Sequence, residues 1–347
     1  GGGSLKQGLD MIQGLKDDGE QIELDLLDVS EMRDDAYAVM VAGLGSPVAM
    51  LDPDMPRFGP DAVFAYRAFQ KAFAAEGKKL EYLYSGEMGG FNTFTPMLVA
   101  ILSDKDPAKR IKFVDADGNG RAVPELNTTI NAFYDHPPKP MGMGSLYGDE
   151  IIVYPTTDHS GEQIARQMCM LYNMRIGFAT WGMNKEEITN ILDVGCVTKA
   201  QKIGKAILTA KETGSDVMDE LKKAFEVREF CRGTIEKLDL RAEGGFDFGT
   251  TVIKGDDGHT YYIDFKNENL ILRDEKGDTI MTAPEGIGMI DLNNCFPLTN
   301  ADTKEGMRVL VTMTPAHPNW WDEDHKAYTC WLPELKKVGM KGDQVRY

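Results

Sequence analysis

The chain lacks the features that mark several large classes of protein. Its longest apolar run, PMLVAIL at residues 96–102, is far shorter than the roughly 18–20 residues of a membrane-spanning helix. Its five cysteines and five histidines are scattered, without CxxC, HxH or HxxxH spacing, so neither a disulfide scaffold nor a zinc ribbon is predicted. No GxxxxGK[ST] loop is present, and Gly-rich turns alone are weak evidence for a nucleotide site. The cysteine usage predicts a reducing, cytoplasmic location.

Positive charge is also scarce. Lys and Arg number 38 against 55 Asp and Glu, which gives a net charge of −17. Such a surface repels nucleic acid and anionic membranes, because both require a positive footprint. We therefore expect neither as a partner, and a small molecule remains the natural ligand. A length of 347 residues predicts two domains.

Strands and helices alternate through the first half of the chain. Short apolar runs that end in Gly or polar turns predict strands at residues 37–42, 80–85, 111–116, 150–157 and 175–182. Helical patterns lie between them at residues 62–77, 93–102 and 162–174, and again from Asn184, and SGEQ at 160–163 predicts a capping box. This alternation predicts an α/β fold with a mostly parallel sheet, flanking helices and right-handed crossovers.

The second half of the chain has a different pattern. Residues from about 186 to 232 read as mostly helical, with residues 198–212 and 216–231 as the clearest pieces. From about residue 236, residues 250–265 and 270–284 each predict strand, turn and strand, and residues 307–315 add another strand. We therefore predict an N-terminal α/β domain over 1–165, and a second domain over 166–347 in which a helical segment to about 235 precedes a β-rich part.

Three turns of the first half are candidates for a ligand site. GLGSP (43–47), SGEMGGFN (85–92) and DADGNGR (115–121) each follow a predicted strand. In a parallel sheet the carboxyl ends of the strands share one edge, where ligands bind. Glu87, Asp115, Asp117 and Glu125 would bring carboxylates there, which suits general acid–base chemistry. The alternative is that the glycines close tight turns and the aspartates cap helices; the three turns together favour a site.

DADGNGRAVPE, at residues 115–125, looks at first like a calcium-binding loop. An EF-hand places a Glu at position 12 and is entered from a helix. Counted from Asp115, position 12 is Leu126, Glu125 comes one residue early, and the strand-like IKFV precedes the loop. The calcium interpretation therefore fails, and the carboxylates remain for other chemistry.

The chain resembles the S-methyl thiohydantoin desulfurase family. The resemblance rests on GGGS, VAGLGSP, EMGGFNTFTPMLVA, VDADGNGRAVPEL and YYIDFKNENLILR, which occur in order over nearly the whole chain. Chains of the family begin before a G-x-G-G-G-G loop, so GGGS would be the end of that motif; a cloning linker is the alternative. The resemblance implies an α/β domain, a β-rich domain, and hydrolysis of a cyclic S-methylated thiohydantoin to methanethiol and hydantoin. An auxiliary subunit of a hydantoinase or oxoprolinase is the competing function.

The resemblance leads to hypotheses for individual residues. Asp115 or Asp117 would be the base for the water, and Glu87 the acid or a ring-orienting group. Arg121 would hold a propionate carboxylate of the substrate by a bidentate pair. Glu125 would be a further catalytic carboxylate. The amides of Asn92 and Asn119 would form hydrogen bonds to the ring. The rest of the site would be lined by Gly2, Gly3, Ser4 and Gly45.

A divalent metal ion is the cofactor that this set of residues could hold. Asp115, Asp117 and Glu87 are of the type that holds an ion which activates water, and His136 or His317 could add a nitrogen ligand. Spacing alone favours turn or surface roles for both histidines.

Two further features leave alternatives open. Cys196 precedes an apparent helix, which can lower a thiol pKa and make a nucleophile; a small buried hydrophobe is the favoured alternative. Trp320 and Trp321 would form an aromatic wall, an interface anchor or part of the core. The β-rich domain would close over the ligand edge or form a homo-oligomer.

Overall fold

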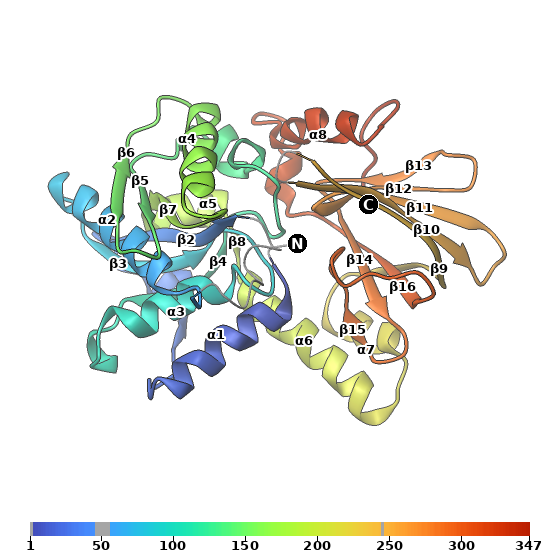
Figure 1. Cartoon of the computed structure of the whole chain (residues 1–347), viewed down its shortest axis with the longest axis horizontal. Helices are drawn as coiled ribbons and strands as arrows, with labels where there is room; N and C mark the ends of the chain where they lie inside the picture. The colour runs from blue at the N-terminus through green and yellow to red at the C-terminus, as the bar shows by residue number, and fades with distance from the viewer. Residues whose placement is uncertain (1–2, 46–55, 244–245) are drawn as a thin grey trace. The chain divides into compact units, whose positions relative to one another are not determined.

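The computed structural model describes residues 3–45, 56–243 and 246–347 (Figure 1). The chain divides into two compact units, Gly1–Val197 and Thr198–Tyr347. The first is an α/β unit and the second is β-rich after a helical segment, which confirms the predicted fold class. The predicted domain boundary at 165 lies inside helix α4 (Asp158–Leu171).

The sheet of the first unit is mixed. Its described strands lie in the order β1-β4-β3-β2-β7-β5-β6, and β8 pairs with β4. The pairs β1–β4, β4–β3 and β3–β2 are parallel, as predicted, whereas the pairs that involve β5, β6, β7 and β8 are antiparallel. The bounds are β1 Leu26–Leu27, β2 Tyr37–Gly45, β3 Leu80–Ser85, β4 Lys112–Asp117, β5 Met141–Gly144, β6 Glu150–Val153, β7 Arg175–Met183 and β8 Asp193–Val194.

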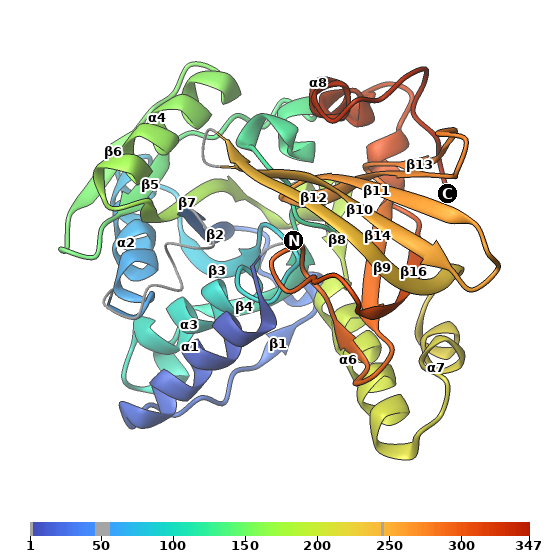
Figure 2. The same ribbon diagram turned by 45° about the vertical axis from the view of Figure 1, so that its right-hand side comes forward.

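The helices of this unit include α1 (Leu5–Asp17), α2 (Pro60–Ala75), α3 (Phe94–Ser103), α4 and α5 (Lys185–Ile191). Figure 2 shows α1 alongside α3. The predicted capping box at 160–163 is wrong by one turn, because the N-cap of α4 is Thr157 and its partner is Ser160. Ser160 is therefore the third residue of the helix, and its side chain accepts the backbone N–H of the N-cap residue Thr157.

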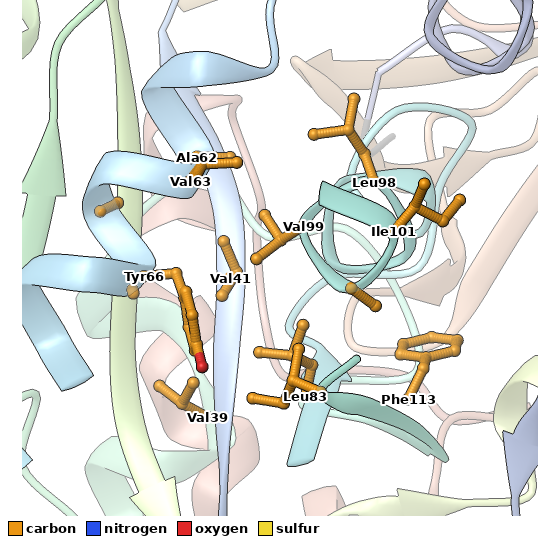
Figure 3. Close-up of a cluster of buried hydrophobic side chains, with 14 of the residues drawn as sticks. Val39, Val41, Ala62, Val63, Tyr66, Leu83, Leu98, Val99, Ile101 and Phe113 are labelled. Atoms are coloured by element: carbon orange, nitrogen blue, oxygen red, sulfur yellow. The ribbon is translucent and has the colours of Figure 1, made fainter. Parts of the chain in front are cut away.

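The core of the first unit lies between α2, α3 and the sheet. Figure 3 shows Tyr66 of α2 directed toward Val39 of β2, and Val99 of α3 directed toward Val41 of the same strand. The cluster contains Ala62, Val63 and Tyr66 from α2, Leu98, Val99 and Ile101 from α3, and Val39, Val41, Leu83 and Phe113 from the strands. All of them are buried, so the apolar side chains predicted for both helices lie in the core.

Glycines in β5 and β7 allow α2 to approach the sheet at backbone distance. A Cβ on Gly177 would lie 2.1 Å from the carbonyl oxygen of Asp61, and a Cβ on Gly144 would lie 2.3 Å from the same oxygen. No side chain can occupy that space without moving the helix. The Gly-rich MGMG sequence of β5 has little strand propensity, which explains why the sequence did not predict this strand.

The second unit contains an antiparallel sheet. Its described strands lie in the order β13-β12-β11-β10-β9-β16-β14-β15. The bounds are β9 Arg228–Glu243, β10 Phe246–Gly255, β11 Thr260–Lys266, β12 Glu268–Arg273, β13 Thr279–Thr282, β14 Gly286–Asp291, β15 Phe296–Pro297 and β16 Arg308–Thr314. The predicted strands at 250–265, 270–284 and 307–315 are confirmed. Helices α6 (Cys196–Thr213), α7 (Val217–Ala224) and α8 (Leu332–Lys337) accompany this sheet.

The helix predicted over 216–231 is too long. It ends at Ala224, and β9 begins at Arg228. Cys231 and Ile235 are both buried on β9, and this spacing fits the two-residue repeat of a strand. Trp320 and Trp321, for which a core, wall or interface role was expected, differ in their packing. Trp320 is fully buried beside Trp331, whereas Trp321 stacks on Tyr328.

No described helix is both long enough and apolar enough to cross a membrane.

We expect Gly177→Ala to lower the free energy of unfolding by about 2–3 kcal/mol, because the added methyl group collides with the backbone of α2. Gly204→Ala is the matched control, since Gly204 lies within α6 with open space around its Cα; it should raise the free energy of unfolding by about 0.5–1 kcal/mol. Urea unfolding of the full chain measures both. A Gly177→Ala protein as stable as the wild type would contradict the close approach of α2.

Candidate functional site

A cavity of about 60 Å³ lies at the carboxyl edge of the parallel strands. Gly43 and Leu44 of β2, Gly86 and Glu87 after β3, and Asn119 after β4 all line it. The predicted turns therefore meet at one place, as the parallel order of β2, β3 and β4 requires. Residues 123–126 and parts of α4 and β7 complete the wall.

The carboxylate of Glu87 connects three loops at this cavity. Its Oε1 accepts a hydrogen bond from the N–H of Val123 (2.9 Å), and its Oε2 accepts one from Nδ2 of Asn92 (2.6 Å). Oδ1 of Asn92 in turn accepts the N–H of Gly43 (2.9 Å). Burial raises the pKa of Glu87, while the bonds from Val123 and Asn92 and the charge of Arg121 act in the opposite direction. Glu87 is thus the predicted carboxylate that is both held in place and in contact with the cavity.

Asn119 ties the loop after β4 to its neighbours. Its Nδ2 donates to the carbonyl oxygen of Gly86 (2.7 Å), and its Oδ1 accepts the N–H of Ile130 (3.0 Å). The amides of Asn92 and Asn119, which were expected to bond to a ring, therefore both have protein partners. Both position the loops that form the cavity.

Asp117 is completely buried behind the loop. Its Oδ1 accepts the N–H groups of Asn119 (3.0 Å) and Gly120 (2.7 Å), whereas its Oδ2 has no hydrogen-bond partner among the residues that the structure describes. Burial of this half-satisfied carboxylate raises the pKa of Asp117 to about 7. Asp117 does not line the cavity.

Asp115, on β4, contacts the N-terminal end of α6. Its Oδ1 accepts the N–H of Val197 (2.8 Å), and its own carbonyl oxygen accepts the N–H of Gly195 (2.8 Å). A carboxylate at a helix N-terminus is stabilised by the orphan N–H groups and by the helix dipole. Asp115 is also outside the cavity lining, and the neighbouring Cys196 is buried.

Glu125 lines the cavity and is half-buried. Arg121 does not line the cavity; its charge acts on the carboxyl group of Glu87, and its Nε donates to the carbonyl oxygen of Ala122 (3.1 Å). The structure thus places two of the four predicted carboxylates, Glu87 and Glu125, in the wall, and the other two behind it.

The N-terminal segment packs against the loop after β3. Ser4 caps α1 through a capping box with Gln7. A Cβ on Gly90 would lie 2.4 Å from the backbone nitrogen of Leu5, and a Cβ on Gly3 would lie 2.2 Å from Cβ of Phe91. Gly45 is the last residue of β2. Gly2, a predicted site residue, and the last two residues of the GLGSP turn lie outside the described residues.

Glu162 and Trp181 are among the wall residues that were not predicted from the sequence. Glu162 on α4 is buried, accepts the N–H of Leu126 (3.0 Å) and pairs with Arg166 (2.6 Å). The sequence pattern assigned Glu162 to a helix cap, which hid its contact with the cavity. Nothing in the pattern distinguishes Trp181, the other residue, from core aromatic residues.

Trp181 occupies a strained position beside the cavity. Its φ is +55°, which is rare for a bulky side chain, and the pairing of β2 with β7 shifts register between Ala38 and Met40 opposite it. The hydroxyl of Tyr84 holds the carbonyl oxygen of Trp181 at 2.7 Å. Such irregularities commonly redirect a side chain next to a functional site.

The residues suggested for a metal ion are not arranged as a ligand set. Within the described ranges, no three His, Cys, Asp or Glu side chains gather so as to hold an ion. The hydrogen bonds recorded for the carboxylates of Asp115, Asp117 and Glu87 come from backbone N–H groups or from a side-chain amide. His136 contacts the carbonyl oxygen of Gly182, and His317 belongs to the second unit.

Comparison with known proteins assigns a family to both halves of the chain. The model for the S-Me-THD-like N-terminal domain matches residues 1–155, and that for the S-Me-THD-like C-terminal domain matches residues 156–333. A crystal structure of a protein from Chromobacterium violaceum has a TM-score of 0.80 and 22% sequence identity, covering 100% of this chain and 94% of that one. At that identity the match shows the fold alone. No curated protein matches the chain.

Asp117 should make stability depend on pH. Its pKa of about 7 in the folded chain exceeds the value of about 3.9 expected when unfolded, so the folded chain binds more protons between these values. The free energy of unfolding should therefore fall as pH rises from about 4 to about 7. The Asn side chain of the Asp117→Asn variant does not titrate. Between pH 5 and pH 7 the free energy of unfolding should therefore fall less in this variant than in the wild type, by about 2 kcal/mol.

Urea unfolding at a series of pH values measures this difference. The exposed Asp25 supplies the control, since Asp25→Asn should leave the pH profile unchanged. A constant difference between wild type and Asp117→Asn across pH 4–8 would mean that Asp117 titrates like a solvated carboxyl group.

Proposed function

The chain belongs to the S-Me-THD-like family, and we propose that it hydrolyses an S-methylated thiohydantoin to methanethiol and a hydantoin. The observation that carries this proposal is the placement of Glu87: a carboxylate with a raised pKa, fixed by two hydrogen bonds in the wall of a cavity at the ligand edge of the sheet. A scaffold or auxiliary subunit has no requirement for such a group.

The proposed reaction is a substitution at an amidine-like carbon. Water adds to the ring carbon that carries the S-methyl group, which gives a tetrahedral intermediate. The carbon–sulfur bond then breaks, the carbon becomes a carbonyl group, and methanethiolate takes a proton to leave as methanethiol. The step consumes one water and needs no oxidant or reductant.

Glu87 is proposed to move the proton. As a carboxylate it removes a proton from the attacking water, and as the resulting acid it returns that proton to the departing sulfur. A carboxyl group is most effective in both directions when its pKa is raised toward the working pH. Burial shifts the pKa of Glu87 in that direction.

The remaining residues receive supporting roles. Glu125, also in the wall, is proposed to orient the ring by accepting its N–H, and Arg121 to hold a carboxylate arm of the substrate. Asp115 and Asp117 lie outside the lining, so we assign them to positioning: Asp115 fixes the start of α6, and Asp117 holds the turn that carries Asn119.

Glu87→Gln should lower the turnover of S-methyl thiohydantoins by about 100-fold or more, because the proton-transferring group is lost. Thiol release by the purified full chain measures this, over a panel that includes plain thiohydantoins and hydantoins, with and without a metal chelator. Glu186→Gln, at an exposed position, should retain wild-type turnover.

A double variant separates catalysis from folding. In Glu87→Gln the new amide NH2 faces the NH2 of Asn92, so the loop loses a hydrogen bond. Adding Asn92→Asp restores an acceptor both for the N–H of Gly43 and for the new amide at position 87. It also keeps the local charge, but moves the carboxylate to a buried position outside the lining. We expect wild-type stability without wild-type turnover. Normal thiol release from this double variant would exclude Glu87 as the proton carrier.

Inactivity of the wild type across the panel, together with a hydantoinase or oxoprolinase that co-purifies in equal amount, would favour the auxiliary-subunit function instead.

A further inference from the structure

A second cavity, of about 360 Å³, lies at the opposite ends of two strands that lead to the first. Leu80 and Glu81 begin β3, and Ile111 and Lys112 lie at the start of β4; all four line this cavity. At about 3.3 Å per residue, the six residues of each strand separate it from the Glu87 site by roughly 20 Å. Residues of α2, the end of α3 and residues 109–110 form the other walls.

Arg110, one of the lining residues, is buried. The Arg110 side chain is only 7% exposed, and its hydrogen bonds go to the backbone carbonyl oxygens of Gln21 (2.7 Å), Asp104 (3.3 Å) and Glu23 (3.5 Å). No carboxylate of the described residues pairs with it. Buried charges in proteins are normally paired, since desolvation of a lone charge is costly. Carbonyl dipoles orient Arg110 but leave its positive charge uncompensated.

Three more cations surround the mouth. Arg67 on α2 and Lys112 on β4 are exposed, and neither forms an ion pair within the described ranges. Lys109 has an exposed, 3.4 Å contact with Asp106. Glu81 is the acidic residue of the lining, and it already lies 3.3 Å from Lys79 and 3.7 Å from Arg33. The cavity is therefore strongly positive on a chain whose net charge is −17.

The rest of the lining suits an organic body. Val63, Leu80 and Ile111 supply an apolar floor. Tyr66 lies beside them; its hydroxyl accepts a bond from Gln70 (3.0 Å), and burial raises the pKa of Tyr66 to about 12, so the phenol keeps its proton as a donor. The volume falls in the range of small-molecule sites.

We propose that this second cavity binds a small organic dianion, a dicarboxylate or a phosphate ester, through Arg67, Arg110 and Lys112. The guanidinium groups match the planar geometry of carboxylate and phosphate oxygens, and Lys112 adds a point charge. The site is separate from the proposed hydrolytic site and does not rest on that function.

Calorimetric titration of the full chain with glutarate and with inorganic phosphate, at low ionic strength, tests the proposal. At least one of these dianions should bind, and the neutral glutaramide should not. Arg67→Gln combined with Lys112→Gln should weaken binding by at least about tenfold, because two charge-assisted contacts are lost. Both residues are exposed, so the variant should fold. The relative affinities for glutarate and phosphate identify the preferred anion.

A second pair of substitutions controls for net charge. Lys16→Gln with Lys139→Gln removes the same two charges from exposed positions outside the cavity and should change binding less than twofold. Failure of both dianions to bind would overturn the proposal. Equal weakening in the two double variants would also overturn it, because the attraction would then be diffuse.

Discussion

The loops at the ligand edge depend on the hydrogen bonds of one carboxylate. Glu87 joins Val123 to Asn92, and Asn92 joins the same network to Gly43 on β2. Asn92 is buried and the other groups of the network are partly buried, so their partners within the protein replace much of the water that they would otherwise bind. The geometry of the cavity and the protonation of Glu87 are therefore set by the same contacts. A change that frees the carboxylate for chemistry also loosens the wall, which is why a compensated double substitution is needed to separate the two.

The sequence predicted those parts of the fold that are governed by local pattern. The apolar runs of β2, β3, β4 and β7, the stripe of α2 and the hairpins of the second unit all follow from periodicity. The errors arose where tertiary packing decides the outcome. Strand β5 consists of Met and Gly and forms because α2 needs glycines beneath it. Residues 225–231 carry both helical and alternating apolar patterns, and the sheet selects the second.

The sequence predicted a site at the edge of the sheet where the cavity lies, but it did not predict which carboxylates line the cavity. Asp115 and Asp117 are two residues apart on β4, so they lie on the same face of the strand, and both are engaged behind the loop rather than in the wall. Sequence spacing establishes that they share a face, but not which face the cavity adjoins. Glu162 and Trp181 reach the cavity from α4 and β7, and only the packing of those elements on the sheet brings them there.

The position of the two cavities at opposite ends of β3 has a mechanical consequence. β3 pairs in parallel with β2 on one side and with β4 on the other, so it cannot slide along its axis without breaking the hydrogen bonds of both ladders. The two cavities are therefore held at a fixed spacing by the sheet itself, and a molecule in one of them cannot draw the other closer.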